Sequence, residues 1–163
     1  CDPRMSFAEI QRVLRPDGLL MFTTLGPDTL YELRQAWARV DDYPHVNMFY
    51  DMHDVGEAMM ESGLAEPVLD TDRYTLTYET SMALMKDLKV LGARNVNTGR
   101  RRGLTGKQTI KAVADAYEVF RNDGVLPATY EVVYGHAWGG QVKQQHHDGE
   151  VRIPVSQIQR RKQ

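Results

Sequence analysis

The stretch that decides the fold is residues 7–24, FAEIQRVLRPDGLLMFTT. Its first half repeats apolar residues at helical spacing, and the capping-box pair Ser6 and Glu9 predicts a short amphipathic helix that begins at Ser6. Residues 15–18, Arg-Pro-Asp-Gly, predict a turn, because proline and glycine break the helical pattern. The apolar run 19–25 is too short for a buried helix and predicts a strand covered on both faces. A helix, a tight turn and a buried strand indicate an α/β sheet.

Four further helices and two further strands are predicted downstream. Capping side chains and apolar periodicity place two helices after Asp28 and Asp51, and apolar periodicity places two more after Thr80 and near Lys107. Alternating residues predict strands at 73–78, with unlike faces, and at 129–137. Gly63 and Gly92 are expected at helix ends, because glycine tolerates the left-handed conformation found there. Residues 95–106 contain little apolar sequence and predict a loop.

The composition indicates one ordinary domain. The chain has 163 residues, 42% of them hydrophobic, which is enough for a core without stabilising cross-links. We expect residues 1–155 to form the globular unit, with a short edge strand at 151–155, and residues 156–163 to fray. The sequence begins Cys1-Asp2-Pro3 and not with methionine, so we interpret it as a piece of a longer protein.

Charge and cysteine content argue against several classes of partner. A formal net charge of -2 and a pI near 6.2 give no reason to expect a nucleic acid. The single cysteine cannot form an internal disulfide, and no apolar run approaches the roughly 18 residues that a membrane span requires. We therefore expect a cytoplasmic protein without a membrane partner.

Five further motifs extend what residues 7–24 indicate. They are ELRQAW at 32–37, PHVN at 44–47, DMHD at 51–54, LKVLGARNVNTGR at 88–100 and PATYEVVYGHAWG at 127–139. With these motifs the chain resembles, over nearly its whole length, the malonyl-[acyl-carrier protein] O-methyltransferases of biotin synthesis, which are class I S-adenosylmethionine-dependent methyltransferases. The resemblance implies the C-terminal part of a Rossmann-like, doubly wound α/β sheet. Strands five, six and seven would lie in the order five, seven, six, with flanking and inserted helices.

The resemblance implies an intact parent that methylates the free carboxylate of a malonyl thioester on an acyl carrier protein. No GxGxxG-like turn follows a strand here, and the family's first four strands are not in this sequence. We therefore expect this chain alone neither to bind S-adenosylmethionine nor to methylate, and its fifth strand to self-associate through an unpaired edge. The alternatives are a non-catalytic module that binds an acidic carrier protein, and a related methyltransferase for another small acceptor.

Substrate recognition is expected to depend on cations and hydrogen-bond donors. A malonyl carboxylate is already ionised at neutral pH, so its alignment matters more than a general base, and no catalytic residue is predicted. By resemblance, Lys89 and Arg94 lie at the end of the helix that caps the substrate entrance, where Arg94 can hold a carboxylate through two parallel hydrogen bonds. The alternative is that both are solvated cations that stabilise a helix C-terminus.

A cationic patch follows the same helix. It consists of Arg100 with Arg101 and Arg102, and of Lys107 and Lys111 further on. Such a patch can steer an acidic carrier protein towards the active site. The alternative is a solvated loop without a partner.

Further candidates are polar residues of a loop and of the last strand. His45 and Asn47 can donate hydrogen bonds to a malonyl thioester, although most loop histidines have no such role. Tyr130, Tyr134 and His136 alternate on one strand face and can line a pocket wall, but a packed sheet requires the same alternation, and we favour a core position for two of the three.

Two histidine groups superficially resemble metal ligands. His53 lies beside Asp51 and Asp54, and residues 146–148 read His-His-Asp. Neither group has the spacing of a zinc site. We expect both to be surface features and predict no metal cofactor.

Overall fold

The computed structural model describes residues 2–101 and 103–140. Its elements are α1 (Pro3–Val13), β1 (Leu19–Leu25), α2 (Tyr31–Ala38), α3 (Met52–Glu61), β2 (Ala65–Tyr78), α4 (Ser81–Val90), α5 (Lys107–Tyr117), the 3-10 helix η1 (Glu118–Phe120) and β3 (Leu126–Trp138). The predictions made for Cys1, Arg102, the strand 151–155, the run 146–148 and the tail 156–163 lie outside the described residues. No helix within the described ranges is long and apolar enough to cross a membrane.

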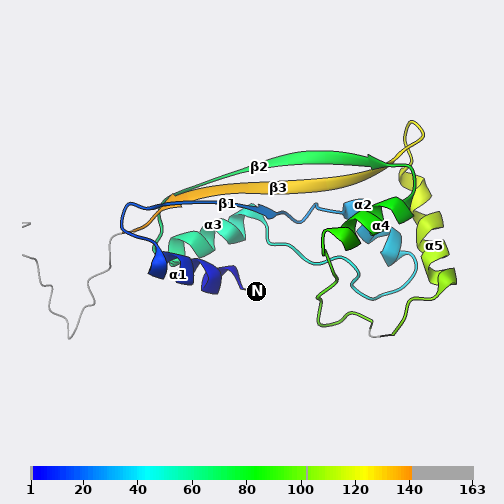
Figure 1. The fold of residues 1–163 in the computed structure, drawn as a ribbon, viewed down its shortest axis with the longest axis horizontal. Coiled ribbons are helices and arrows are strands. Elements are labelled where there is room, and N and C mark those ends of the chain that lie inside the picture. The colour runs from blue at the N-terminus through cyan, green and yellow to red at the C-terminus, as the bar shows by residue number, and fades with distance from the viewer. Residues whose placement is uncertain (1, 102, 141–163) are drawn as a thin grey trace, which may run out of the picture.

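The three strands form one antiparallel sheet in the order β1, β3, β2. β1 pairs with β3 from Leu19 opposite Trp138 to Leu25 opposite Val132. β2 pairs with β3 along its whole length, with an irregularity after Ala65. The predicted strand order and the α/β class are confirmed. Figure 1 shows the strands with α1 and α3 below one end, and with α2, α4 and α5 grouped at the other.

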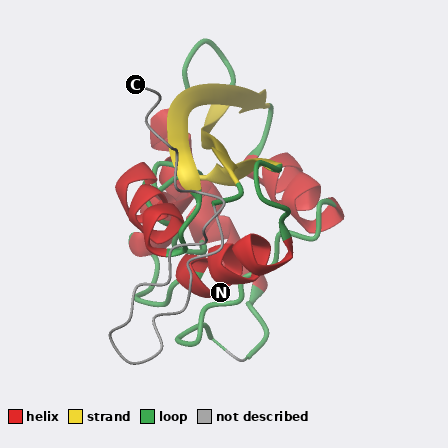
Figure 2. Cartoon of the chain, turned by 90° about the vertical axis from the view of Figure 1, so that its left-hand side faces the viewer, coloured by secondary structure: helices red, strands yellow, loops and turns green. Residues whose placement is uncertain are grey.

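Helices pack on the sheet in two clusters. One joins α1 and α3 to the sheet through Phe7, Val55, Ala58, Met59, Leu64 and Ala137. The other joins α2, α4 and α5 to the start of β3 through Leu33, Trp37, Leu84, Val113, Tyr117, Leu126 and Ala128. The first cluster buries Ala137 of β3, and the second buries Leu126 and Ala128. Odd-numbered and even-numbered residues of a strand point to opposite sides, so the two clusters contact locally opposite sides of β3. Figure 2, viewed from one end, shows the helices around the lower side of the sheet.

Local signals predicted three helices correctly. The Asp51 and Thr80 side chains each accept a hydrogen bond from the backbone N–H three residues later, and so cap α3 and α4. α5 begins at Lys107. Gly63 and Gly92 follow α3 and α4 with φ of 85° and 72°, the left-handed conformation that favours glycine.

Two helix starts differ from the prediction. α1 begins at Pro3 and not at Ser6, because the Asp2 side chain accepts from the Arg4 N–H and proline suits the first helical position. α2 begins after Leu30, which has φ of 55° and no side-chain cap, so Asp28 is not its N-cap. Contacts distant in sequence determine this second start.

β3 determines where α2 begins. Beyond the end of β1, the Leu30 N–H donates to the Thr129 carbonyl at 2.7 Å. The buried Glu32 carboxylate accepts from the Thr129 N–H at 3.0 Å, and the Thr29 hydroxyl donates to the Glu131 carbonyl at 3.1 Å. Atoms of a turn and of a helix thus continue the pairing along this edge of β3. α2 is held beside the end of β1, where it forms part of the candidate site.

The strands are longer and more exposed than predicted. β2 starts at Ala65 rather than near residue 73, and β3 also extends past both predicted ends. The prediction that β1 is covered on both faces is wrong, since the side chains of Leu19 and Met21 are 46% and 73% exposed. Residues 73–78 form part of a strand as predicted, so their two chemically unlike faces are present, but neither face is covered there, because residues 70–77 are all exposed. β1 and β2 are the edge strands of the described sheet, and its buried side chains all lie on the central β3, at Leu126, Ala128, Val133 and Ala137.

Candidate functional site

A cavity of about 270 Å³ lies where α2, the loop before α3, the end of α4 and β3 meet. We call it the Arg94 pocket. Leu30, Leu33, Phe49 and Leu88 provide apolar walls. Its polar lining includes His45, Asn47, Arg94 and Tyr130, so four of the six predicted site residues line one cavity. This clustering of an apolar cavity with a few convergent polar groups is typical of small-molecule sites.

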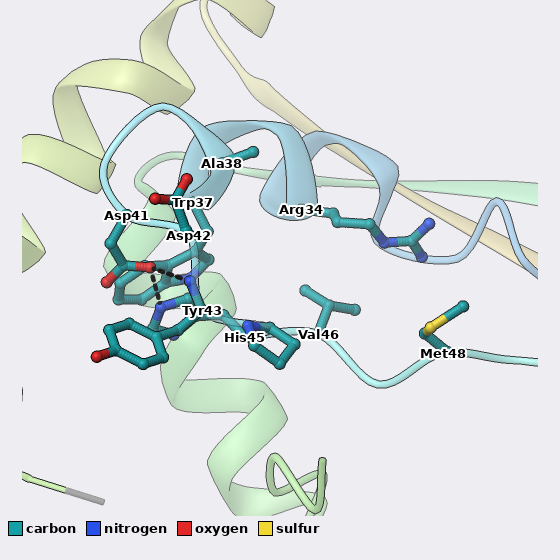
Figure 3. A pocket seen from close by; sticks show the side chains of 10 residues that line it. Arg34, Trp37, Ala38, Asp41, Asp42, Tyr43, His45, Val46 and Met48 are labelled. Carbon is teal, nitrogen blue, oxygen red and sulfur yellow. Dashed lines mark hydrogen bonds and ion pairs between the residues drawn. The ribbon is translucent and has the colours of Figure 1, made fainter. Parts of the chain in front are cut away.

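His45 lies between this cavity and a second one. Its Nε2 is 2.7 Å from Asp41 Oδ1, and its ring stacks on Trp37 with centroids 3.5 Å apart and an interplanar angle of 11°. The imidazole is only 12% exposed. His45 also lines a more open hollow of about 470 Å³, the Arg34 pocket, which Figure 3 shows with Asp41 bonded to the ring. Asp41 and Trp37 therefore hold the His45 ring in one orientation at the boundary of the two cavities.

Asn47 joins its loop to the segment that contains Arg94. The Asn47 Nδ2 donates to the Arg94 carbonyl at 3.1 Å, and its Oδ1 accepts from the Val96 N–H at 3.0 Å. Both polar ends of the amide are thus engaged with backbone. Asn47 positions Arg94, whose side chain is exposed at the pocket.

Tyr130 provides a phenol on β3. Its ring is half-buried, and burial, followed by the neighbouring Tyr78, raises the pKa of Tyr130 to about 12. Burial and the nearby Glu32 raise the pKa of the fully buried Tyr117 further still. Tyr130 is therefore a neutral hydrogen-bond donor at every physiological pH.

The raised pKa values of Tyr117 and Tyr130 predict that the free energy of unfolding decreases at alkaline pH. Their pKa values in the folded chain lie above the value of about 10 for an unfolded tyrosine. Their stabilising contribution is therefore present below pH ~10 and falls as the pH rises through the folded pKa of Tyr130, about 12. Unfolding by urea at pH 8 to 11.5 should show Tyr130→Phe losing less stability across this range than the unmodified chain. Equal losses of stability in Tyr130→Phe and the unmodified chain would contradict the raised pKa of Tyr130. Tyr50→Phe, at an exposed tyrosine, is the control and should lose as much stability as the unmodified chain.

Comparison with known proteins identifies relatives of this chain. No family model matches the chain. The malonyl-[acyl-carrier protein] O-methyltransferase of Laribacter hongkongensis is 58% identical over 136 residues, which are 83% of this chain and 46% of that protein. The protein of the same name from Halorhodospira halophila is 51% identical over 158 residues, 94% of this chain and 54% of its own length. This chain is homologous to part of the malonyl-[acyl-carrier protein] O-methyltransferases.

The match confirms the predicted resemblance and its partial extent. A third malonyl-[acyl-carrier protein] O-methyltransferase, from Gallionella capsiferriformans, is 55% identical over 82% of this chain and 46% of its own length. The chain thus spans about half the length of the curated relatives that it matches. A solved structure, a putative methyltransferase from Bacillus halodurans, aligns with 86% of this chain and 59% of its own, with a TM-score of 0.49 and 16% sequence identity. The fold described above rests on this chain's own strand pairing and not on that similarity.

Two predicted site residues do not line the Arg94 pocket of this malonyl-[acyl-carrier protein] O-methyltransferase homologue. Lys89 is exposed in the last turn of α4. Arg100 is exposed in the following loop, where its N–H donates to the Asn97 carbonyl at 3.2 Å. Arg101, Lys107 and Lys111 are also exposed, so the described cations of the patch are available to a partner.

The three alternating residues of β3 do not share one pocket. Tyr130 lines the Arg94 pocket, whereas Tyr134 and His136 line a shallow hollow across the three strands. The Tyr134 hydroxyl lies 2.9 Å from that of Tyr74, and its side chain is 40% exposed, so it is not a core residue. The described residues contain no group of three acidic, histidine or cysteine side chains that could hold a metal, and His53 is exposed.

Sequence reasoning missed the groups that hold the site together. Asp41 and Trp37 orient His45, and Asn95 and Asn97 bond the loop that contains it. The i, i+4 spacing of Asp41 and His45 was a usable signal. The asparagines gave none, because their partners lie 51 residues away in the sequence.

Proposed function

We propose that this chain provides the acceptor side of a malonyl-[acyl-carrier protein] O-methyltransferase. The observation that carries the proposal is the Arg94 pocket, in which a cation, an imidazole, an amide and a phenol line one largely apolar cavity. Small-molecule sites commonly have volumes of about 300–1,000 Å³. A cavity near 270 Å³ is slightly smaller, which suits a short acyl group.

The pocket residues have distinct roles in this proposal. The Arg94 guanidinium neutralises the malonyl carboxylate and holds it through parallel hydrogen bonds. Tyr130 and Asn47 are donors or positioning groups near the thioester, and the apolar walls exclude water that would solvate the reacting oxygen. Since the carboxylate is already ionised, the remaining task is to hold one oxygen about 3–3.5 Å from the methyl carbon and in line with it.

S-adenosylmethionine is the methyl donor that the family name implies for the whole protein, and it supplies an electrophilic methyl group when bound. We assign no residue of this chain to it, because no glycine-rich turn leads from a strand into a helix in this sequence. Biotin synthesis as the pathway and a cytoplasmic setting belong to the same proposal.

An acyl carrier protein is the proposed partner. Arg100, Arg101, Lys107 and Lys111 are exposed on one loop and the helix that follows it, and Lys89 is exposed on the preceding helix. A surface of this charge attracts an acidic carrier and accelerates its encounter. The attached malonyl thioester would then enter the neighbouring Arg94 pocket.

Calorimetric titration of this chain with malonyl-carrier protein tests the proposal. We expect binding that Arg94→Gln weakens by about 10- to 100-fold, because a charge-assisted pair contributes about 1.5–3 kcal/mol. Arg94→Lys should retain part of the affinity. Arg12→Gln on the remote α1 is the matched control and should bind as the unmodified chain does.

The remaining outcomes distinguish the alternatives. Equal affinity for loaded and unloaded carrier would favour a non-catalytic carrier-binding module. Tighter binding of a different small carboxylate would favour another acceptor, and heat from S-adenosylhomocysteine would show that the chain holds a donor site. No binding of any carrier would refute the proposal.

We also propose that the chain self-associates through β1. Among the described residues β1 pairs with β3 alone, so its other edge presents unpaired backbone N–H and C=O groups. Exposed apolar side chains lie on the same sheet: Leu19, Met21, Val68, Tyr74 and Leu76. A second copy of the chain can satisfy the backbone groups, since its own β1 can pair antiparallel with the first, and the pairing brings Leu19 and Met21 of the two copies close together.

A further inference from the structure

Two loops that are distant in sequence meet beside the Arg94 pocket. One comprises residues 41–50 and contains His45. The other comprises residues 93–100 and contains Arg94 and Arg100. Hydrogen bonds between the two loops fix their relative position. Within the described residues, each of these bonds involves an asparagine side chain.

Four bonds connect the loops, and each joins an asparagine side chain to backbone. Asn95 Nδ2 donates to the Pro44 carbonyl at 2.6 Å, and Asn97 Nδ2 donates to the Val46 carbonyl at 3.1 Å. Asn47 makes the other two, to the Arg94 carbonyl and from the Val96 N–H. Asn97 Nδ2 also lies 2.9 Å from Asn95 Oδ1. We call Asn47, Asn95 and Asn97 the asparagine clasp.

The clasp holds the pocket residues from both sides. The Pro44 and Val46 carbonyls flank His45 in the sequence, so Asn95 and Asn97 fix the backbone on each side of the imidazole. Asn47 likewise fixes the backbone at Arg94. The relative position of His45 and Arg94, which both line the cavity, therefore depends on three amide side chains.

The clasp also reaches the cationic patch. The Arg100 backbone N–H donates to the Asn97 carbonyl at 3.2 Å. Asn97 is thus bonded to Arg100 through its backbone and to Val46 through its side chain. A continuous series of contacts runs from Arg100 through Asn97 and Val46 to His45, and from His45 to the ring of Trp37.

We propose that the asparagine clasp couples carrier docking at Arg100 to the geometry of the Arg94 pocket, with Asn47, Asn95 and Asn97 as positioning residues. This inference rests on the proposed function, because it takes the patch as the docking surface and the pocket as the acyl site. The physical requirement is that docking favours one arrangement of the 93–100 loop. The clasp then transmits that preference to His45, and the coupling is reciprocal between the two sites.

Trp37 provides a direct readout. Its indole stacks on His45, so a shift of the imidazole alters its fluorescence. The chain has two tryptophans, and Trp138→Phe leaves Trp37 as the sole tryptophan, whose emission can be excited selectively at a wavelength that the tyrosines do not absorb. Titration of this single-tryptophan chain with unloaded carrier protein, which has no acyl group to enter the pocket, should change the Trp37 emission.

Variants of Asn97 separate coupling from docking. Asn97→Asp keeps the shape of the side chain but removes the Nδ2 donor to the Val46 carbonyl. Asn97→Ala removes the donor and the rest of the amide group as well. Both variants should bind unloaded carrier within about threefold of the parent but lose the Trp37 response, and should bind malonyl-carrier about tenfold more weakly. Asn122→Ala, at the turn before β3, is the matched control and should retain the response. Circular dichroism confirms that each variant is folded.

Each other outcome overturns the inference. A parent chain that binds unloaded carrier without a Trp37 response has no coupling, although the proposed function would stand. Asn97 variants that respond as the parent does would show that coupling, if present, does not use the clasp. Failure of any carrier to bind the parent would remove the proposed function and this inference together.

Discussion

Tyr117→Ala is expected to lower the free energy of unfolding by about 3–5 kcal/mol, as truncations of large buried aromatic residues do. Tyr117 is fully buried between α2, α4, α5 and β3, and its ring packs edge-on against Phe120 with centroids 5.8 Å apart. Its hydroxyl donates to the Pro127 carbonyl at 2.8 Å. The alanine variant therefore loses a large apolar contact and leaves both a cavity and an unpaired carbonyl.

Urea unfolding followed by circular dichroism measures this loss. Tyr117→Phe is the matched variant, because it removes only the hydroxyl bond and should cost about 1 kcal/mol. Tyr50→Ala, at a tyrosine 47% exposed, should change stability by less than about 0.5 kcal/mol. Similar losses for Tyr117→Phe and Tyr117→Ala would contradict the claim that ring packing dominates. A variant that is unfolded in water would show that the loss reaches the whole stability of the chain, which is about 5 kcal/mol or more for an ordinary domain.

Helix starts were predictable where the cap is local. Asp51 and Thr80 cap the helices that immediately follow them, so the necessary atoms lie within four residues of one another. The start of α2 was not predictable, because Glu32 bonds to Thr129, 97 positions away. Asp28 had the right residue type for a cap, but the pairing of Leu30 with β3 moves the first turn beyond it.

The prediction of strand burial was wrong for a related reason. The run 19–25 was apolar enough to predict burial on both faces, but coverage depends on which elements pack there. Among the described strands only β3 has buried side chains, and Met21 remains largely exposed on β1. The apolar sequence of β1 thus indicated that its side chains favour burial, but it did not indicate which element would cover them.

The candidate site was predicted in part. Residue chemistry and the family resemblance selected His45, Asn47, Arg94 and Tyr130, and the structure brings these four to one cavity. The same reasoning also selected Lys89 and Arg100, which lie outside it. Position near a helix end gives no information about the direction of a long side chain. Arg94 lines the cavity because Asn47 fixes its backbone from 47 residues away, and no local pattern encodes that contact.

Met21→Asp is expected to abolish self-association, raising the dissociation constant of the proposed dimer by at least about a hundredfold. Met21 is 73% exposed in the middle of β1, the strand whose outer edge has no partner among the described residues. If two β1 strands pair, this apolar side chain is brought close to the second copy. The dimer contains two copies of the substitution, so it loses two apolar side chains at the junction and places two carboxylates of like charge near each other.

Multi-angle light scattering over a range of micromolar concentrations provides the measurement. The unmodified chain should change from monomer to dimer with concentration, whereas Met21→Asp should remain monomeric. Met60→Asp is the matched control, because Met60 is 61% exposed on α3, away from the sheet edge, and its substitution should leave the dimer intact. A monomeric unmodified chain would refute the proposal. Equal weakening by both substitutions would instead indicate general charge repulsion. The chain already has a net charge of -2, and each substitution adds one negative charge wherever it lies on the surface.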